Sequence, residues 1–462
     1  MNRPAETEDR GQETGGRSKG ERPLSSLLSP HSAVLPRVSR RILPFLFLVY
    51  VVNFLDRVNV SFAALQMNRD LGFSATGYGF GAGIFFVGYV LCGVPSNALL
   101  LKLGVRRWLG GLMVVWGLVS GLTALVHHAW QFYLLRALLG AAEAGFFPAL
   151  IFYLSRWYPL SERARAVARC MIAVPVALVI GGPLSGAILG LDGSLGFAGW
   201  RWLFVLEALP AMILGLVAWL VLPEGPRDAS WLSAADRELL AATVAEDSAR
   251  AAPLSSHTML HFPPVLWVLS LIWFGVVLVG YGWNLWLPQV LAERSHGTAL
   301  TVGWLAALSQ VAGIAGALWF ADRSDRKRER RLPIAITAAM VVLGLFGLAL
   351  SSGLWTGVAA FAVMSAGQAG LWGPFWTLPG EQIRGPALAT AVAIISSIGN
   401  VGGFLGPWLM GVLRDRTSSY EQGFLVLAGI QLMAVLRAVA VWRGAGGRSG
   451  GQAVRRSDGK RT

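Results

Sequence analysis

The stretch ILPFLFLVYVVNFLDRVNVSFAAL, residues 42–65, is apolar over almost its whole length but carries Asp56 and Arg57 side by side. A helix that spans the hydrocarbon core of a bilayer needs about 20 mostly apolar residues, so this stretch is long enough. A charged side chain inside such a helix costs about 2.5–3.5 kcal/mol on membrane-insertion scales. The stretch therefore predicts a membrane-spanning helix whose two charges have a functional role.

The composition of the whole chain also predicts a membrane protein. Of its 462 residues, 54% are hydrophobic and only 14% are charged, and 56 are Gly and 19 are Trp. Soluble domains carry about 25% charged residues, whereas membrane helices tolerate Gly and place Trp at the interfaces. Cys92 and Cys170 lie in or beside apolar segments without a paired spacing, so they indicate neither a disulfide nor a metal site.

The same length criterion predicts twelve spans, which form two groups of six. The two groups, 42–222 and 264–442, lie between a basic tail (1–41), a central loop (223–263) and a second basic tail (443–462). Within the central loop, the amphipathic stretch AADRELLAATVAEDSAR is expected to form a surface helix. The expected spans are residues 42–66, 78–101, 108–127, 130–154, 166–191, 200–222, 264–291, 300–321, 332–351, 354–377, 386–413 and 421–442.

The basic residues predict how the chain is oriented. With a cytoplasmic N-terminus, 31 of the 39 Lys and Arg residues lie in or beside the inner segments and only five in the outer loops. This asymmetry is what the positive-inside rule describes, so both termini are expected in the cytoplasm. The net charge of +14 is thus explained by topology rather than by nucleic acid. We expect a multi-pass monomer in the inner (plasma) membrane.

The two groups of spans share a feature that indicates a duplicated architecture. The loop after the second span reads KLGVRRW (102–108), and the loop after the eighth reads DRSDRKRERR (322–331). Basic tight-turn loops at equivalent places in two halves are typical of transporters built from repeats. The candidate gating residues in these loops are Lys102, Arg106, Arg107, Asp325 and Arg326.

At this level of detail the chain resembles the anion:cation symporter family of the major facilitator superfamily, in particular its tartrate/phthalate-type organic acid permeases. The resemblance implies an all-α major facilitator fold with twelve membrane helices in two pseudo-symmetric bundles, and import of an organic carboxylate with protons. Two departures are Leu101 before the first basic loop and Ser396 in the eleventh-span motif. The motifs that carry the resemblance are NFLDRVNVSFA (53–63), FFVGYVLCGVPSN (85–97), RALLGAAEAGFFPA (136–149), RWYPLSERARAVA (156–168), GWRWLFVLEALPA (199–211) and SSIGNVGGFLGP (396–407).

Five ionisable residues fall well inside the expected spans, all in the first half of the chain. Counting helical rise places Asp56, Arg57 and Arg136 at one depth and Glu143 about 10 Å deeper on the face of Arg136. We expect Asp56 to pair with one arginine, which leaves the other, Arg57 or Arg136, to bind an anionic substrate. Arg57 is the preferred clamp, because a guanidinium binds a carboxylate through two parallel hydrogen bonds. Glu143, buried without an adjacent charge, is expected to take up protons readily. The five residues are Asp56, Arg57, Arg136, Glu143 and Glu207.

This arrangement predicts a coupling mechanism. Protonation of Asp56 or Glu143 frees an arginine for a carboxylate, which couples inward proton flow to anion uptake. The family resemblance implies the same roles at these positions. The alternative is that buried Asp and Arg form a static pair that only holds helices together. For Glu207, which lies near the outer start of its span, the structural interpretation is at least as strong.

Neutral polar and aromatic residues supply further candidates for the substrate site. In the second half, Trp283, Trp286, Trp372 and Trp376 could form an aromatic wall, although packing is the more common role of such residues. His257 and His261 stand four residues apart in the central loop without a third ligand, so no metal site is expected. Candidates for hydrogen bonds to the substrate, each more often a helix–helix contact, are Tyr89, Asn284, Gln310, Gln368 and Asn400.

Three functions compete on this evidence. The first is a proton-coupled importer of organic anions that needs no cofactor besides protons, and the sequence leaves the acid open. The second is an antiporter of drugs or metabolites with the same fold, disfavoured for cationic cargo by the arginines. The third is a membrane enzyme, disfavoured because the spans contain no set of nucleophile, base and orienting group and no metal cluster.

Overall fold

The computed structural model describes residues 33–250, 264–327, 329–383, 387–434 and 436, and this part of the chain contains helices and no strand. Eleven helical segments within it are long and apolar enough to cross a membrane, and they match the first eleven expected spans. The twelfth expected span begins with the shorter apolar helix Glu421–Ala434, and most of its remaining residues lie outside the described ranges.

The helices follow one another along the chain in two groups. The first half of the chain forms α1 (Leu35–Asp70), α2 (Ala75–Leu103), α3 (Val105–Leu122), α4 (Ala129–Glu143), α5 (Phe146–Ser155), α6 (Leu160–Met171), α7 (Ala173–Leu189), α8 (Gly199–Val221) and α9 (Ala234–Arg250). The second half forms α10 (Pro264–Asn284), α11 (Leu287–Ser295), α12 (Ala299–Lys327), α13 (Arg331–Leu350), α14 (Leu354–Gln382) and α15 (Ala387–Thr417).

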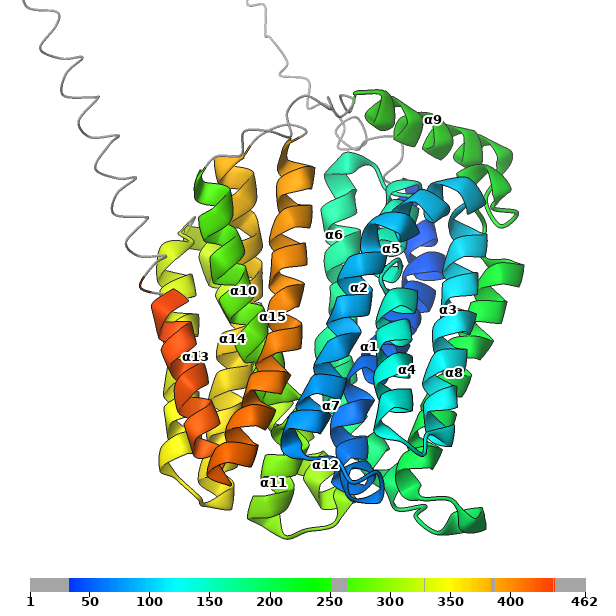
Figure 1. Cartoon of the computed structure of the whole chain (residues 1–462). Coiled ribbons are helices and arrows are strands. Elements are labelled where there is room, and N and C mark those ends of the chain that lie inside the picture. The colour runs from blue at the N-terminus through cyan, green and yellow to red at the C-terminus, as the bar shows by residue number, and fades with distance from the viewer. Residues whose placement is uncertain (1–32, 251–263, 328, 384–386, 435, 437–462) are drawn as a thin grey trace, which may run out of the picture.

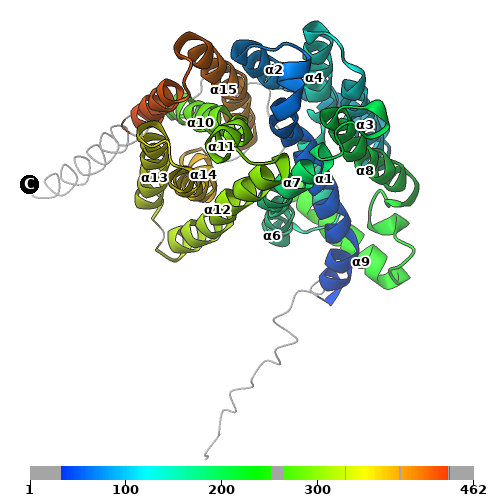
Figure 2. The same cartoon turned by 90° about the horizontal axis from the view of Figure 1, so that it is seen from below.

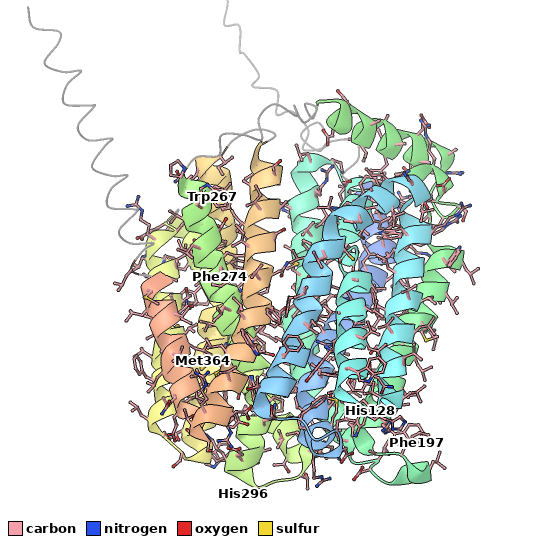
Figure 3. The ribbon with its side chains drawn as sticks, viewed as in Figure 1. His128, Phe197, Trp267, Phe274, His296 and Met364 are labelled. Atoms are coloured by element: carbon pink, nitrogen blue, oxygen red, sulfur yellow. The ribbon has the colours of Figure 1, made fainter. Side chains whose placement is uncertain are left out.

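The membrane helices form two bundles that stand side by side. Figure 1 shows α1–α8 in one bundle and α10–α15 in the other, and Figure 2 shows the same division from below. Helix α9 lies across one end of the first bundle (Figure 1). In Figure 3, His128 and His296 mark the opposite end, whereas Trp267 lies towards the end that carries α9.

Helix α9 confirms the surface helix expected in the central loop, with the same bounds. It is tied to the first bundle by two carboxylates. Asp236 accepts a hydrogen bond from Arg37 at 2.9 Å, and Asp247 accepts one from the backbone N–H of Leu160 at 2.7 Å. The second contact satisfies a free N–H at the start of α6, where negative charge is favourable.

The expected span 130–154 is interrupted close to its charged residues, where α4 ends at Glu143 and α5 begins at Phe146. Pro148 lacks the N–H that would continue the hydrogen-bond ladder into α5. A side chain at Gly145 would clash with the hydroxyl of Ser96 on α2. The interruption places the Glu143 carboxylate at the end of a helix.

Close packing between α2 and α4 brings their side chains together around α1. A Cβ at Gly88 would clash with the carbonyl of Ala137, and a Cβ at Gly140 would clash with the carbonyl of Phe85. Only glycine permits this approach of two backbones, a common device between membrane helices. Helix α4 therefore lies directly against α2, and its Glu143 side chain reaches α1.

The two bundles meet along α2 with α15 and along α7 with α12. Gly182 of α7 and Gly303 of α12 lie so close that a Cβ on either would clash with the carbonyl of the other. Three further contacts lie at the end away from α9. Tyr78 donates to the carbonyl of Leu285 at 2.7 Å, Asn68 donates to Gln289 at 3.4 Å, and Asp415 accepts from the backbone N–H groups of Ala75 and Thr76 at 3.0 and 2.8 Å.

Candidate functional site

Helix α1 presents its charged residues to two neighbouring helices. Successive residues of an α-helix are turned by about 100°, so adjacent residues face different partners. Arg57 contacts Glu143 at the end of α4, whereas Asp56 accepts a hydrogen bond from Ser120 on α3. Both carboxylates are fully buried. The two charges that stand together in the sequence therefore belong to two separate polar clusters.

The first cluster is an ion pair between Arg57 and Glu143. The Nε and Nη2 atoms of Arg57 donate to Oε2 of Glu143 at 3.2 and 2.7 Å, and the amide of Asn53 donates to the same oxygen at 3.0 Å. The Glu143 side chain is 0% exposed and the Arg57 side chain 14% exposed. The expectation that Glu143 has no adjacent charge is wrong, because α4 turns it towards α1.

Aromatic rings surround the guanidinium of Arg57. Its carbon Cζ lies 5.1 Å from the ring centre of Phe85 and 5.2 Å from that of Tyr89. Tyr89, a predicted substrate-binding residue, thus lies beside the ion pair. A guanidinium over aromatic faces gains cation–π stabilisation and loses water, which strengthens its preference for a carboxylate partner.

The second cluster surrounds Asp56, which does not pair with an arginine. Its Oδ1 accepts hydrogen bonds from the hydroxyl of Ser120 and from the amide of Asn59, the latter at 3.1 Å. Its Oδ2 has no hydrogen-bond partner. Within the described ranges, Asp56 makes no ion pair, so the expected pairing of Asp56 with an arginine is wrong in this conformation. Equal depth in the membrane did not determine which residues face one another.

Arg136 is buried without a carboxylate partner in the described part of the chain. Its Nη2 donates to the carbonyl of Ala82 at 3.5 Å, and its Cζ lies 5.1 Å from the ring centre of Phe85. Its Nε and Nη1 atoms have no hydrogen-bond partner. Arg136 lies within the electrostatic reach of both Glu143 and Asp56. It is thus a buried cation placed between the two clusters.

Glu207 of α8 is buried among the polar residues of the first bundle. Its Oε1 accepts a hydrogen bond from Ser185 on α7 at 3.1 Å, and its Oε2 has no partner. Ser120 and Ser185, which hold the two carboxylates, escaped the sequence analysis. A single serine in an apolar span is too common a helix–helix contact to stand out.

The predicted polar residues of the second bundle make neutral contacts. Gln310 accepts a hydrogen bond from Ser365 at 2.7 Å, and Gln368 donates to a backbone carbonyl of α10 at 3.0 Å while its Oε1 has no partner. Asn284 is the last residue of α10, and Asn400 lies on α15, both half-buried. These side chains lie in the other bundle from the ion pair.

The predicted tryptophans pack against other aromatic rings. Trp372 and Trp376 both contact Trp273, with ring centres 5.7 and 4.8 Å away. Trp283 lies 5.8 Å from the ring of Phe361, and Trp286 donates from Nε1 to a carbonyl of α15 at 3.2 Å. These contacts give each of the four residues a packing role.

Tyr281 of α10 is a residue that the sequence analysis missed. Its ring centre lies 4.5 Å from that of Phe86 on α2, and Tyr281 is an electrostatic neighbour of Arg57. It therefore brings the second bundle to the ion pair. The available signal was its position three residues before Asn284, in the polar interruption GYGWN of an apolar span.

The candidate gating residues lie at helix ends and contact their own bundle. Glu224 accepts hydrogen bonds from the backbone N–H groups of Val105 and Arg106 at 3.1 and 3.0 Å, and so caps α3. In the second loop, Arg330 pairs with Asp325 at 2.6 Å, and Arg326 pairs with Asp322 at 2.8 Å. Lys102 lies in the last turn of α2, and Arg107 lies in the first turn of α3.

The described residues contain no group of three or more His, Cys, Asp or Glu side chains that could hold a metal ion. His257 and His261 lie outside the described ranges.

Comparison with known proteins places this arrangement in a family. The sequence pattern of the Major Facilitator Superfamily matches residues 46–407 and 291–455. The chain belongs to this superfamily. It is accordingly a multi-pass membrane transporter and not an enzyme, and its helical architecture is the major facilitator fold.

Two relatives and one solved structure show how far the similarity extends. A protein of Agrobacterium vitis named "Putative tartrate transporter" is 42% identical over 406 residues, covering 87% of this chain and 93% of the relative. The "Quinolone resistance transporter" of Acinetobacter baumannii is 35% identical over 411 residues, covering 88% and 95%. A bacterial homologue of the human lysosomal transporter Spinster, in an inward-facing and occupied conformation, has the same fold, with a TM-score of 0.69, 18% identity and coverage of 90% and 98%.

Proposed function

We propose that this transporter imports a small organic carboxylate together with protons by alternating access of its two bundles. The observation that carries the proposal is the buried ion pair in which Glu143 occupies the guanidinium of Arg57. A carboxylate substrate would bind through the same two N–H groups of Arg57 that now donate to Glu143. The substrate and Glu143 therefore compete for one cation. The name of the tartrate relative supports a carboxylate as the cargo.

Protons decide this competition. An ionised Glu143 holds Arg57, and a protonated Glu143 loses the charge-assisted bonds and releases it. The freed guanidinium then binds the carboxylate of the substrate, assisted by the buried charge of Arg136. When the site reaches the other side of the membrane, loss of the proton restores the ion pair and expels the substrate. Proton flow thereby drives accumulation of the anion, and no cofactor is required.

The contacts between the bundles support alternating access. The hydrogen bonds that Asn68, Tyr78 and Asp415 make between the bundles lie at the end away from α9. That end corresponds to the outer side if the basic tails and α9 face the cytoplasm, as the positive-inside rule predicts. We propose an inner-membrane monomer with both termini inside, in a conformation that is closed on the outer side.

The test is uptake by purified protein in proteoliposomes. A panel of labelled carboxylic acids, including tartrate, is supplied with and without an inward proton gradient. Arg57→Ala is expected to lower uptake by about 30-fold or more, because truncating one partner of a buried charge pair costs about 2–5 kcal/mol. Glu143→Gln is expected to retain substrate exchange while losing accumulation driven by the gradient, since glutamine does not ionise.

Matched controls lie on the surface of the same bundle. Arg69 is on α1 as well, but its side chain is 82% exposed and pairs only with its neighbour Asp70, so Arg69→Ala should transport like the parent. Glu162 pairs with Arg165 on an exposed helix face, so Glu162→Gln should remain coupled. Accumulation by Arg57→Ala and Glu143→Gln at the level of these controls would refute the assigned roles.

Drug antiport is the second candidate, because a relative at 35% identity is named for quinolone resistance. Quinolones also carry a carboxyl group, so Arg57 and Arg136 could contact such a compound. The same vesicles separate the two functions. Import predicts that a labelled carboxylate accumulates with an inward proton gradient, whereas antiport predicts that labelled drug leaves the vesicle lumen in exchange for protons.

A further inference from the structure

A second group of buried carboxyl groups lies apart from the Arg57–Glu143 pair. Asp56 on α1 and Glu207 on α8 are each held by a serine hydroxyl, Ser120 for Asp56 and Ser185 for Glu207. Asn59, one turn after Asp56, donates its amide to Asp56 at 3.1 Å. The five side chains come from four helices and are all buried.

Three acceptor atoms in this group have no hydrogen-bond partner. They are Oδ2 of Asp56, Oδ1 of Asn59 and Oε2 of Glu207. Helices α1 and α8, which carry Asp56 and Glu207, pack against each other, and the charge of Asp56 acts on the Glu207 carboxyl. Buried acceptors without donors are rare in proteins and costly. The group therefore contains more hydrogen-bond acceptors than donors.

Among the described residues, no cationic side chain neutralises these two carboxyl groups through an ion pair. Neither Asp56 nor Glu207 makes an ion pair in the described ranges. The charged groups that act on Asp56 are Arg136 and Glu143 of α4, and those that act on Glu207 include Asp56 but no cation. Two buried carboxylates within electrostatic reach of each other cannot both ionise without a large cost. At least one proton is thus expected on the pair while it is closed off from water.

A proton meets the geometry better than a metal ion does. A carboxyl O–H supplies a donor for an orphaned oxygen next to it, whereas a cation needs about six oxygen ligands around one point. The described residues offer only two carboxylates in this group. Two carboxyl groups that interact electrostatically titrate as a pair and not as separate residues.

We propose that Glu207 is a coupling residue, which together with Asp56 binds a proton separate from the proton of Glu143. The inference rests on the proposed function and adds a second proton-binding site to it. Each transport cycle loads this proton when the cluster faces outer water and releases it to the inner side. Glu207 acts on the substrate only through Asp56 and Arg136, so its role is energetic coupling and not substrate contact.

The experiment measures how many protons accompany each substrate. Proteoliposomes with a set substrate gradient are titrated with opposing membrane potential and pH gradient until net flux is zero. Glu207→Gln is expected to lower the coupling ratio by about one proton per substrate and to keep accumulation through Glu143, because the pair then holds one titratable group fewer. Asp56→Asn should have the same effect, and the double variant no further one.

A second variant keeps the test valid if Glu207→Gln does not fold. Ser185→Ala retains both carboxyl groups but removes the hydroxyl that favours ionised Glu207, so the pH of half-maximal uptake should move upward. Ser309→Ala is the matched control, since Ser309 is buried but bonds only to its own helix backbone. A pH profile of Ser185→Ala that equals that of Ser309→Ala overturns the proposal.

The possible failures can be told apart. If the parent protein shows no gradient-driven accumulation, the proposed function itself fails. If the parent is coupled and Glu207→Gln has an unchanged ratio, only the role of Glu207 fails, and the carboxyl pair is a structural contact. Substrate accumulation that is driven by the Na⁺ gradient instead of the pH gradient also overturns the proposal, because the cluster would then bind a metal cation and not a proton.

Discussion

The two bundles of this transporter share one architecture but differ in their buried polar residues. In the described part of the first bundle, Asp56, Arg136, Glu143 and Glu207 are buried and Arg57 nearly so. In the described part of the second bundle, the buried polar side chains are all neutral: Ser270, Ser309, Gln310, Ser324, Thr337, Ser365 and Gln431. Only ionisable groups change with pH, so we infer that the first bundle couples and the second bundle shapes the site.

Among the variants that keep the charge of the first bundle, the largest expected effect comes from altering its geometry. Arg57→Lys keeps a cation but replaces the planar fork by a single ammonium, which cannot bind a carboxylate through two parallel bonds. We expect uptake to fall by about 10- to 100-fold, since one charge-assisted hydrogen bond contributes about 1.5–3 kcal/mol. The measurement is the initial rate of carboxylate uptake across substrate concentrations.

Arg69→Lys on the same helix provides the control, because Arg69 is exposed in the last turn of α1. Both variants keep the charge of the chain, so a difference between them reports the geometry at Arg57 alone. Equal uptake by Arg57→Lys and Arg69→Lys would show that the guanidinium fork is not the group that receives the substrate.

The membrane spans were predictable from the sequence, and the pairing inside them was not. Length and hydropathy determine where a helix can cross a bilayer, which is why the first eleven spans were placed correctly. The cost of burying charge singled out Asp56, Arg57 and Glu143. The partners of these residues depend on the rotation of each helix about its axis. The depth of a residue in the membrane gives no information on that rotation. Asp56 and Arg57 consequently face α3 and α4, respectively.

The small residues around the charges were less predictable. Gly88, Gly140 and Gly145 set the approach of α2 to α4, yet the chain contains 56 glycines and nothing in the sequence separates these three from the others. Ser120 and Ser185 were overlooked for the same reason. Such residues acquire their roles from the neighbours that the fold brings to them, so a single sequence cannot distinguish them.

The contact between the bundles offers an effect of intermediate size. Asp415 of α15 accepts two N–H groups at the start of α2 and so joins the bundles at the end away from α9. A carboxylate at a helix N-terminus contributes about 0.5–2 kcal/mol. Asp415→Asn should therefore open this end about two- to 30-fold more often, measured as faster maleimide labelling of a cysteine that replaces Asn68.

Asp192→Asn is the matched control, because Asp192 caps the start of α8 through the N–H of Gly199 at 2.8 Å within one bundle. Loss of that cap weakens a helix end but not the contact between bundles. Labelling that rises equally in both variants would mean that Asp415 stabilises a helix only, and that the closed end is held by the packing of α2 with α15 and α7 with α12.

The smallest expected effect lies in the second bundle, at Gln368. Its amide donates to α10 while its Oε1 has no partner, so this oxygen is available to a hydroxyl of the substrate. Gln368→Leu should raise the substrate concentration for half-maximal uptake by less than about tenfold, since a neutral hydrogen bond contributes about 0.5–1.5 kcal/mol. The coupling ratio should not change, because no titratable group is lost.

Gln310→Leu is the control, because the Gln310 side chain already bonds to Ser365. This variant should leave both the half-maximal substrate concentration and the coupling ratio near those of the parent. Loss of gradient-driven accumulation in Gln368→Leu would instead give the second bundle a part in coupling, and the difference between the bundles would then be one of composition and not of function.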